Sequence, residues 1–87
     1  MNHFIGVHEK KYAVALEWYK TLKEEDQLAI VKSPRKLLVM DMYYGLNGNR
    51  VHTLLDIGKR LDVSRECVRH IKAKALRIIS NWKEKNQ

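Results

Sequence analysis

A break of three residues, 62–64, separates two segments in which apolar residues recur at the spacing of a helix. Ser64 can cap the second segment, residues 65–82, because its hydroxyl can accept a hydrogen bond from an unpaired amide of the first turn. Thr53 can cap the first segment, residues 54–61, in the same way. The residues expected to face inward are Leu54, Ile57 and Leu61, then Val68, Ile71, Ala75, Ile78 or Ile79, and Trp82. Two helices joined by so short a break form a helix-turn-helix.

Ser33 followed by Pro34 marks the start of another helix, because serine caps backbone amides and proline is tolerated at the first helical position. We expect this helix to run to about Tyr43 and to end at Gly45, which suits a left-handed C-terminal position. Its apolar residues are Leu37, Leu38, Val39, Met40 and Met42. They cover most sides of the helix, so it is expected to lie in the centre of the core.

Strand patterns are nearly absent, so helix is expected throughout the chain. Before residue 33, we expect a helix from about Glu9 to Leu22 and a bend or short break near Glu24–Asp26. The sequence therefore predicts an all-α fold of four to five helices with a C-terminal helix-turn-helix. Residues 1–32 would form an N-terminal helical segment of unassigned role, and residues 33–87 the helix-turn-helix domain. The aromatic residues expected in the core or an interface are Tyr12, Trp18, Tyr19 and Trp82.

Several classes of protein are excluded by what the sequence lacks. No apolar run reaches the roughly 20 residues of a membrane-spanning helix, and the first residues lack the apolar centre of a signal peptide. The single cysteine, Cys67, cannot form an internal disulfide and fits a reducing cytoplasm, the expected location. The four histidines lack the spacing of metal ligands, so no metal or other cofactor is expected. No paired carboxylates, activated nucleophile or phosphate-binding glycine loop indicates an enzyme.

The positive charge of the chain lies in its second half. Residues 1–32 contain five lysines and five acidic residues and sum to zero, whereas residues 33–87 contain twelve basic and five acidic residues and sum to +7. A basic half in a small chain favours a polyanionic partner, nucleic acid first, although a solvated basic surface gives the same pattern.

The inward positions of the last helix fix its exposed face, which has the chemistry needed to read DNA bases. Arginine can donate two hydrogen bonds to guanine, and glutamate can accept one from cytosine N4. The expected base-reading residues are Arg65, Glu66, Arg69 and His70. The residues expected to meet backbone phosphates are Lys59, Arg60, Ser64, Lys72, Lys74 and Arg77. The alternative is a solvated helix face on which Glu66 and Arg69 form an ordinary surface pair.

Two stretches carry a resemblance to a known family. One comprises Asp62-Val63-Ser64-Arg65-Glu66, Val68-Arg69 and Ala73-Lys74-Ala75-Leu76-Arg77, and the other Pro34-Arg35-Lys36-Leu37-Leu38-Val39-Met40 and Tyr43-Tyr44-Gly45-Leu46. From about Ser33 to Trp82 the chain resembles region 4 of the housekeeping-type sigma factors of bacterial RNA polymerase. It departs from that pattern at His70, where a glutamine is usual, and at Cys67, where a basic residue is common.

The resemblance implies that the chain binds double-stranded promoter DNA at a −35-type element and contacts the β-subunit flap of the RNA polymerase core. The sigma regions that bind the clamp and melt the −10 element are not expected in 87 residues. The apolar patch expected to meet polymerase consists of Leu37, Leu38 and Met42. A second regulatory protein is a further expected partner, through residues 1–32. The expected contexts are a phage or mobile-element regulator, a split sigma subunit that works with a second protein, or a sigma-like activator.

Two other functions remain open on the sequence alone. The chain can be a stand-alone helix-turn-helix regulator without polymerase contact, which specific DNA binding without core-enzyme binding would favour. It can also be an interaction module that occupies the polymerase flap and alters promoter choice without reading DNA. Polymerase binding that survives loss of the basic face would favour that function.

Overall fold

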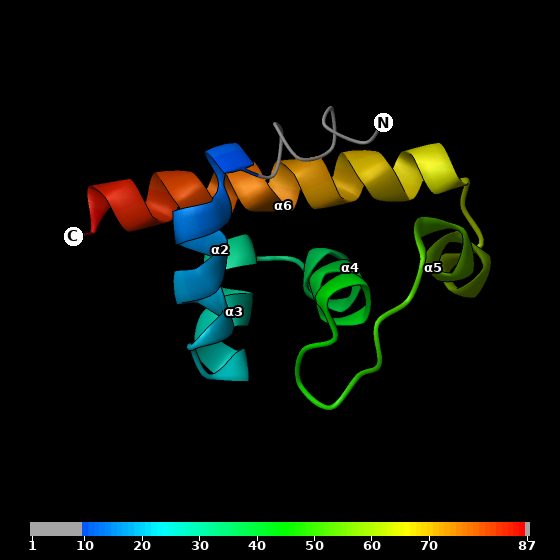
Figure 1. Ribbon diagram of the computed structural model, residues 1–87, viewed down its shortest axis with the longest axis horizontal. Coiled ribbons are helices and arrows are strands. Elements are labelled where there is room, and N and C mark those ends of the chain that lie inside the picture. The colour runs from blue at the N-terminus through cyan, green and yellow to red at the C-terminus, as the bar shows by residue number, and fades with distance from the viewer. Residues whose placement is uncertain (1–9, 87) are drawn as a thin grey trace.

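The computed structural model describes residues 10–86, which form five helices and no strand. Labelled as in Figure 1, the helices are α2 (Ala13–Lys20), α3 (Glu24–Val31), α4 (Pro34–Tyr44), α5 (Leu54–Leu61) and α6 (Arg65–Lys85). The prediction of an all-α fold with a C-terminal helix-turn-helix is confirmed. No helix of this described part is long and apolar enough to cross a membrane.

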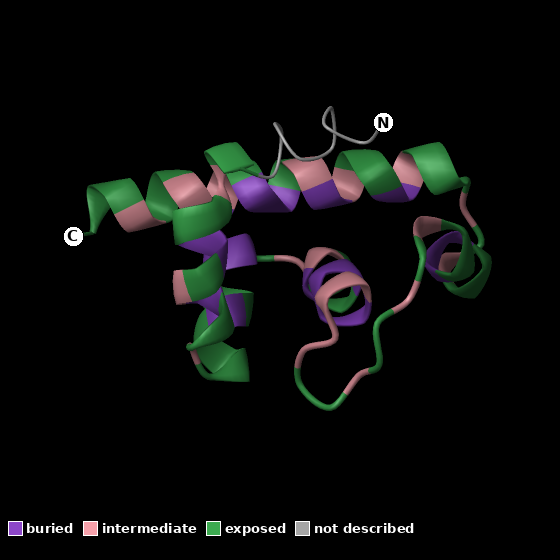
Figure 2. Ribbon diagram, in the orientation of Figure 1, coloured by how far each residue is buried: buried purple, intermediate pink, exposed green. Residues whose placement is uncertain are grey.

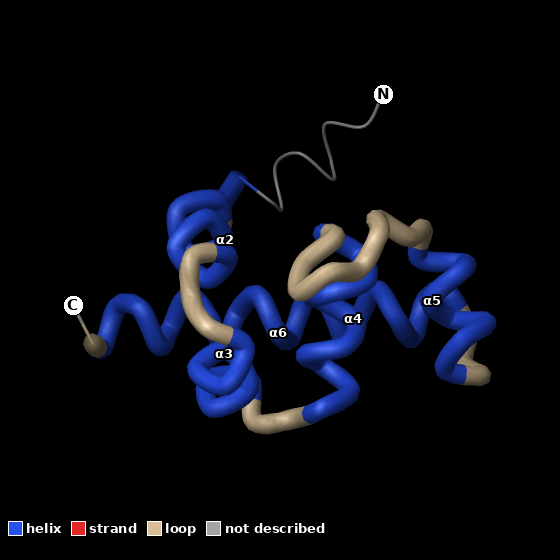
Figure 3. Tube along the Cα trace, turned by 90° about the horizontal axis from the view of Figure 1, so that it is seen from below, coloured by secondary structure: helices blue, strands red, loops and turns tan. Residues whose placement is uncertain are grey.

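The long helix α6 forms one side of the molecule, and the four shorter helices all contact it. They are spread along one flank, with α5 near the first turns of α6, α4 near its middle, and α2 and α3 further on (Figure 1). Figure 3 shows the same arrangement from below. The buried residues of α6 lie on the flank that faces these helices, and exposed residues lie on the opposite flank (Figure 2). The fold therefore presents one face of α6 to the outside.

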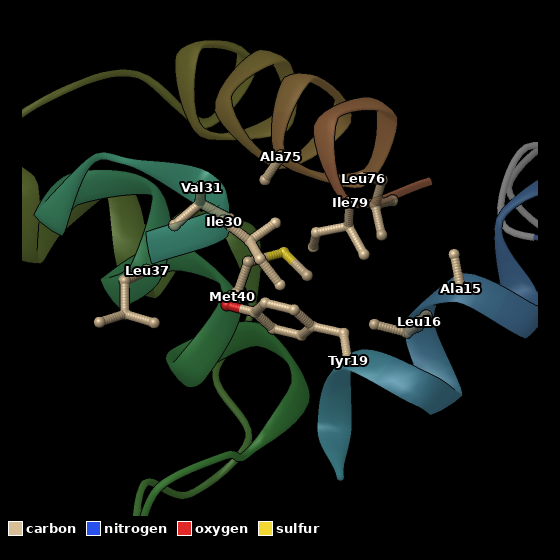
Figure 4. Packing of buried hydrophobic residues seen from close by; sticks show 10 residues of the cluster. All are labelled: Ala15, Leu16, Tyr19, Ile30, Val31, Leu37, Met40, Ala75, Leu76 and Ile79. Atoms are coloured by element: carbon tan, nitrogen blue, oxygen red, sulfur yellow. The ribbon is translucent and has the colours of Figure 1, made fainter. Parts of the chain in front are cut away.

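The core consists of two clusters of buried apolar residues. The first joins α2, α3, α4 and α6 (Figure 4) and contains Ala15, Leu16, Tyr19, Ile30, Val31, Leu37, Met40, Ala75, Leu76 and Ile79. The second lies under the helix-turn-helix and contains Val39, Met42, Ile57 and Val68. Apolar packing is thus continuous across residue 33, where the sequence suggested a division into two parts. The helix α4 contributes to both clusters, as expected for a helix predicted to lie in the centre of the core.

The N-terminal helices differ from the prediction in where they break. The break lies at residues 21–23, and the acidic residues Glu24, Glu25 and Asp26 form the first turn of α3 instead of a bend. Carboxylates in a first turn interact favourably with the positive end of the helix dipole, which explains the earlier start. The helix start expected at Glu9 lies outside the described residues.

The last helix differs from the prediction at its C-terminal end. It continues to Lys85, and Trp82 does not face the core. Instead, the Trp82 ring stacks on Trp18 of α2, with ring centroids 6.3 Å apart. Ile79 is fully buried while Ile78 is half-buried, and Leu76 is a core residue that the sequence pattern missed. The aromatic contact with α2 extends the packed part of α6 beyond its apolar stripe.

A partly buried polar network ties α2, α3 and α4 to the loop before α5. Gln27 donates from Nε2 to the backbone carbonyl of Tyr19 at 2.9 Å. Asn47 donates from Nδ2 to Gln27 Oε1 and to Asp41 Oδ1, each at 2.8 Å. Burial raises the pKa of the Asp41 carboxyl, the hydrogen bond from Asn47 lowers it, and the nearby charge of Glu24 raises it. The network satisfies polar groups that would otherwise be costly to bury.

Candidate nucleic-acid interface

The turn between α5 and α6 is built from local hydrogen bonds that the sequence predicted. Thr53 Oγ1 accepts from the amide of Asp56 at 3.1 Å, and Ser64 Oγ accepts from the amide of Cys67 at 3.0 Å. Asp62 ends α5 in the left-handed conformation, at φ 60°. These contacts set where α6 begins, and hence which residues occupy its first two turns.

Gly58 allows the turn to fold closely against α5. A Cβ at this position would lie 2.7 Å from the carbonyl oxygen of Val63, a distance that real Cβ atoms do not show. The amide of Val63 also donates to the carbonyl of Gly58 at 2.9 Å. A side chain at this position would therefore collide with the turn backbone that leads into α6.

The four residues expected to read bases, Arg65, Glu66, Arg69 and His70, are all exposed on the first turns of α6. Glu66 and Arg69 form an ion pair in which Arg69 Nε donates to Glu66 Oε2 at 3.1 Å and Nη2 donates to the same oxygen. His70 Nε2 lies 3.4 Å from Glu66 Oε2 and 3.4 Å from Arg69 Nη2. Donors and an acceptor are thus gathered in one exposed cluster, the combination that readout of base edges requires.

The ion pair sets the charge state of this cluster. The hydrogen bond from Arg69 lowers the pKa of Glu66, desolvation opposes this effect, and the charges of Arg69, His70 and Arg65 lower the pKa further. The hydrogen bond to Glu66 in turn raises the pKa of Arg69. Glu66 therefore stays an acceptor and Arg69 a donor at any pH at which DNA binding would be measured.

The residues expected to meet phosphates divide into an exposed group and one buried exception. The exposed members are Lys59 and Arg60 on α5, and Ser64, Lys74 and Arg77 at the start and along the outer side of α6. Lys72 is only 6% exposed, and its Nζ lies 4.3 Å from the centre of the Tyr43 ring. The expectation that Lys72 is exposed toward the DNA backbone is wrong, because the residue lies within the buried stripe of α6.

The apolar patch expected to meet polymerase also needs correction. Met42 is 1% exposed and belongs to the cluster under the helix-turn-helix, and Leu37 is buried in the cluster shared with α2 and α3. Of the three residues expected in this patch, Leu38 alone reaches the surface. A helix as apolar as α4 is covered on most sides here by its neighbours, so it leaves no large patch of its own.

The structure shows a different apolar surface that the sequence pattern missed. A hollow of about 520 Å³ lies between α5 and the loop before it, lined by Tyr43, Val51, His52, Thr53, Leu54, Leu55 and Arg65. Val51 is 74% exposed and Leu55 is 49% exposed. Two sequence features could have indicated this surface. Leu55 is an apolar residue that does not share the inward face of α5, and Val51 is an apolar residue in a polar loop.

The described residues contain no group of side chains that could hold a metal ion. Comparison with known proteins identifies the family of the chain. The family model for Sigma-70, region 4 matches residues 33–80, which include α4, α5 and most of α6. No solved structure matches the chain.

Its curated relatives are sigma factors of bacterial RNA polymerase. RNA polymerase sigma factor RpoD of Neisseria gonorrhoeae is 47% identical over 45 residues, 52% of this chain and 7% of that protein. Sigma factor SigA1 of Synechococcus elongatus is 43% identical over 60 residues, 67% of this chain and 15% of that protein. SigA of Lactococcus lactis subsp. cremoris is 40% identical over 57 residues, 64% of this chain and 16% of that protein.

The chain therefore spans less than a fifth of the length of these relatives. They are bacterial proteins, so they give no support to the expected phage source. Region 4 is the part of sigma factors associated with the promoter −35 element, and it is a transcription module without enzymatic activity. The match over more than half of the sequence shows that the chain belongs to the Sigma-70 region 4 family.

Proposed function

We propose that this chain binds duplex promoter DNA at a −35-type element through α6 and contacts RNA polymerase through a separate apolar surface. The observation that carries the proposal is the exposed cluster of Arg65, Glu66, Arg69 and His70 on the first two turns of α6. These turns are the part of a recognition helix that enters the major groove. Membership of the Sigma-70 region 4 family supports the same conclusion.

The surrounding charges are arranged to hold the duplex against this cluster. Lys59 and Arg60 flank the cluster from α5, and Lys74 and Arg77 follow it along α6. From Arg65 to Arg77 a helix rises about 18 Å, enough for side chains at its two ends to reach phosphates on opposite sides of a groove. Contacts of this kind fix orientation, while the cluster supplies the sequence preference.

The DNA-binding test starts from a pool of duplexes with a randomised central window, from which the protein selects its preferred site. Affinities for that selected duplex and for a scrambled duplex are then measured by fluorescence anisotropy. Arg69→Ala should weaken binding to the selected duplex by roughly 5- to 150-fold and relax the preference at one base pair. Arg35→Ala removes the same charge from α4 and should leave this preference intact. Equal losses on both duplexes for Arg69→Ala would remove Arg69 from the reading set.

The polymerase contact is proposed at the hollow beside α5, where Val51 and Leu55 are exposed. Neighbouring apolar side chains that remain uncovered together mark surfaces for partners, whereas a single exposed apolar residue does not. Val51→Glu together with Leu55→Glu should abolish retention by core RNA polymerase in a pull-down and leave the helix content unchanged. The matched control is Val14→Glu, which charges an equally exposed apolar residue on α2.

The two alternative functions give different results in the same experiments. Selection of a specific duplex by a protein that shows no affinity for core polymerase at micromolar concentration would favour a stand-alone regulator. Retention by polymerase without selection of any duplex would favour the interaction module.

A further inference from the structure

His70 is placed so that its hydrogen-bonding role depends on its own proton. Its side chain is 64% exposed on the outer face of α6. Its Nε2 atom lies 3.4 Å from Glu66 Oε2, which can only accept, and 3.4 Å from Arg69 Nη2, which can only donate. A protonated Nε2 can therefore donate to Glu66, whereas an unprotonated Nε2 can accept from Arg69.

The surroundings of the ring leave this choice open. Among residues 10–86, the charged groups recorded against His70 are Glu66 and Arg69, both on α6 itself, and Arg65 acts on the same Glu66 carboxylate. Glu66 Oε2 already accepts two hydrogen bonds from Arg69, so the ring is not needed to hold that ion pair. The imidazole is therefore available to a partner on the open side of the helix.

We propose that protonation of His70 makes the DNA readout of this chain depend on pH, by favouring guanine over adenine at the base pair that His70 faces. The proposal rests on the function proposed above, because it assumes that the first turns of α6 lie in the major groove.

The direction follows from the two base edges. Guanine presents two acceptors, N7 and O6, in the major groove, whereas adenine presents the acceptor N7 beside the N6 amino donor. A neutral imidazole has one donor and one acceptor nitrogen, but an imidazolium has two donors and no acceptor. With Nε2 directed at Glu66, the ring offers Nδ1 to the base. A bare Nδ1 can accept from the N6 amino group of adenine, whereas the Nδ1–H of an imidazolium can only donate, which suits the acceptors of guanine and opposes that amino group. Histidine is the kind of side chain that changes charge between about pH 5 and pH 8 in general, so the preference is compared across that interval.

The experiment measures a ratio of affinities, so that a general gain of positive charge cancels. Duplexes carry each of the four base pairs at each position of the selected site, and anisotropy gives their affinities at about pH 5.5 and about pH 8. At one position of the site, the affinity for the guanine duplex divided by that for the adenine duplex should be at least about fivefold higher at about pH 5.5 than at about pH 8. His70→Gln should abolish that change, because glutamine carries a donor and an acceptor at both pH values and suits adenine.

His52→Gln is the control for loss of a different histidine, whose Nδ1 lies 2.7 Å from the Arg50 carbonyl and which lines the hollow beside α5, outside the proposed base-reading set. It should retain the pH dependence of the unaltered protein. A guanine-to-adenine ratio that stays constant with pH, or that changes equally in His70→Gln, would overturn the inference while leaving specific binding at other positions intact. If no duplex is selected at either pH, the proposed function itself fails, and the inference fails with it.

Discussion

Lys72 and Lys74 are separated by one residue on α6 and have different surroundings. The Lys72 side chain is buried, and its ammonium group lies over the Tyr43 ring at 4.3 Å and near the Tyr44 ring at 6.0 Å. Lys74 is exposed on the outer side of the helix. A cation over an aromatic ring attracts the face of that ring, and the aliphatic stem of a lysine packs like an apolar side chain. Lys72 thus belongs to the core, and Lys74 to the surface.

The first prediction uses these two lysines as a matched pair. Lys72→Ala should lower the free energy of unfolding by about 1–2 kcal/mol, because the buried stem and the ring contact are both lost. Lys74→Ala should leave stability unchanged, weaken selected and scrambled duplexes equally, and reduce the salt slope of binding by about 0.9. Urea unfolding and anisotropy measure the two effects. If Lys72→Ala kept full stability and behaved like Lys74→Ala toward DNA, the corrected assignment would be wrong.

For single residues of α6, the sequence predicted the exposed positions more accurately than the buried ones. Arg65, Glu66, Arg69 and His70 follow from helical spacing, since they lie opposite Val68 and Ala75. Lys72 lies one helical turn after Val68 and one turn before Leu76, in the middle of the buried stripe. The spacing thus predicts burial of Lys72, whereas its charge suggested exposure, because the sequence does not show that Tyr43 and Tyr44 lie against its ammonium group.

At the scale of elements, helix starts were predictable because each is specified locally. Ser33, Thr53 and Ser64 each accept a hydrogen bond from a backbone amide three residues later. The start of α3 and the end of α6 were not predicted. The start of α3 depends on its acidic first turn and on the hydrogen bond from Gln27 to the Tyr19 carbonyl across the break between α2 and α3. The end of α6 depends on the stacking of Trp82 with Trp18, which are distant in the sequence. Helical periodicity indicates neither feature.

The second prediction concerns the start of the recognition helix. Ser64→Ala should lower the free energy of unfolding by about 1 kcal/mol, because the amide of Cys67 loses its acceptor. Ser64→Asp should keep the cap, and hence the stability, since aspartate is as good a capping residue as serine. It should nevertheless weaken DNA binding, because a carboxylate there repels phosphate. Urea unfolding and anisotropy on both variants separate these effects. Unchanged DNA affinity in Ser64→Asp would show that the start of α6 does not approach the backbone.

At the scale of the whole molecule, the partly buried network of Gln27, Asn47 and Asp41 connects the N-terminal helices to the loop that leads into the helix-turn-helix. Asp41 is buried on α4, and burial raises the pKa of its carboxyl. The folded protein therefore binds a proton more tightly at this group than the unfolded chain does. The stability that this proton contributes is present in full below the pKa of the unfolded chain and is lost as pH rises through the pKa of the folded state.

The third prediction follows from this loss of stability with rising pH. Asp41→Asn cannot ionise but can still accept from Asn47 through its side-chain oxygen. The free energy of unfolding of Asp41→Asn, minus that of the unaltered protein, should therefore increase as pH rises from about 4 to about 7. Urea unfolding at a series of pH values measures this difference. A difference that stays flat across the series, or that decreases, would show that Asp41 is not held in its protonated form by the fold.

The last prediction concerns the charge of the whole DNA-binding surface. The exposed cations that surround the reading cluster are Lys59, Arg60, Lys74 and Arg77, and the buried Lys72 is not among them. Each phosphate neutralised by such a cation contributes about −0.9 to the slope of log affinity against log salt concentration. Four contacts therefore predict a slope near −4, and replacing two of them, with Lys59→Ala and Arg60→Ala together, should bring it to about −2.

Titration of a fluorescent duplex at several salt concentrations measures this slope. The net charge of the whole chain does not predict this slope, because some of its cations lie outside the surface assigned to DNA. Arg35 and Lys85 are exposed there, and Lys36 and Lys83 are half-buried. Replacing Arg35 and Lys85 with alanine together is the matched control, which should leave the slope near −4. A slope near zero in the unaltered protein would mean that the basic surface does not contact phosphates, and the interaction module would then account for the chain better than a reader of DNA.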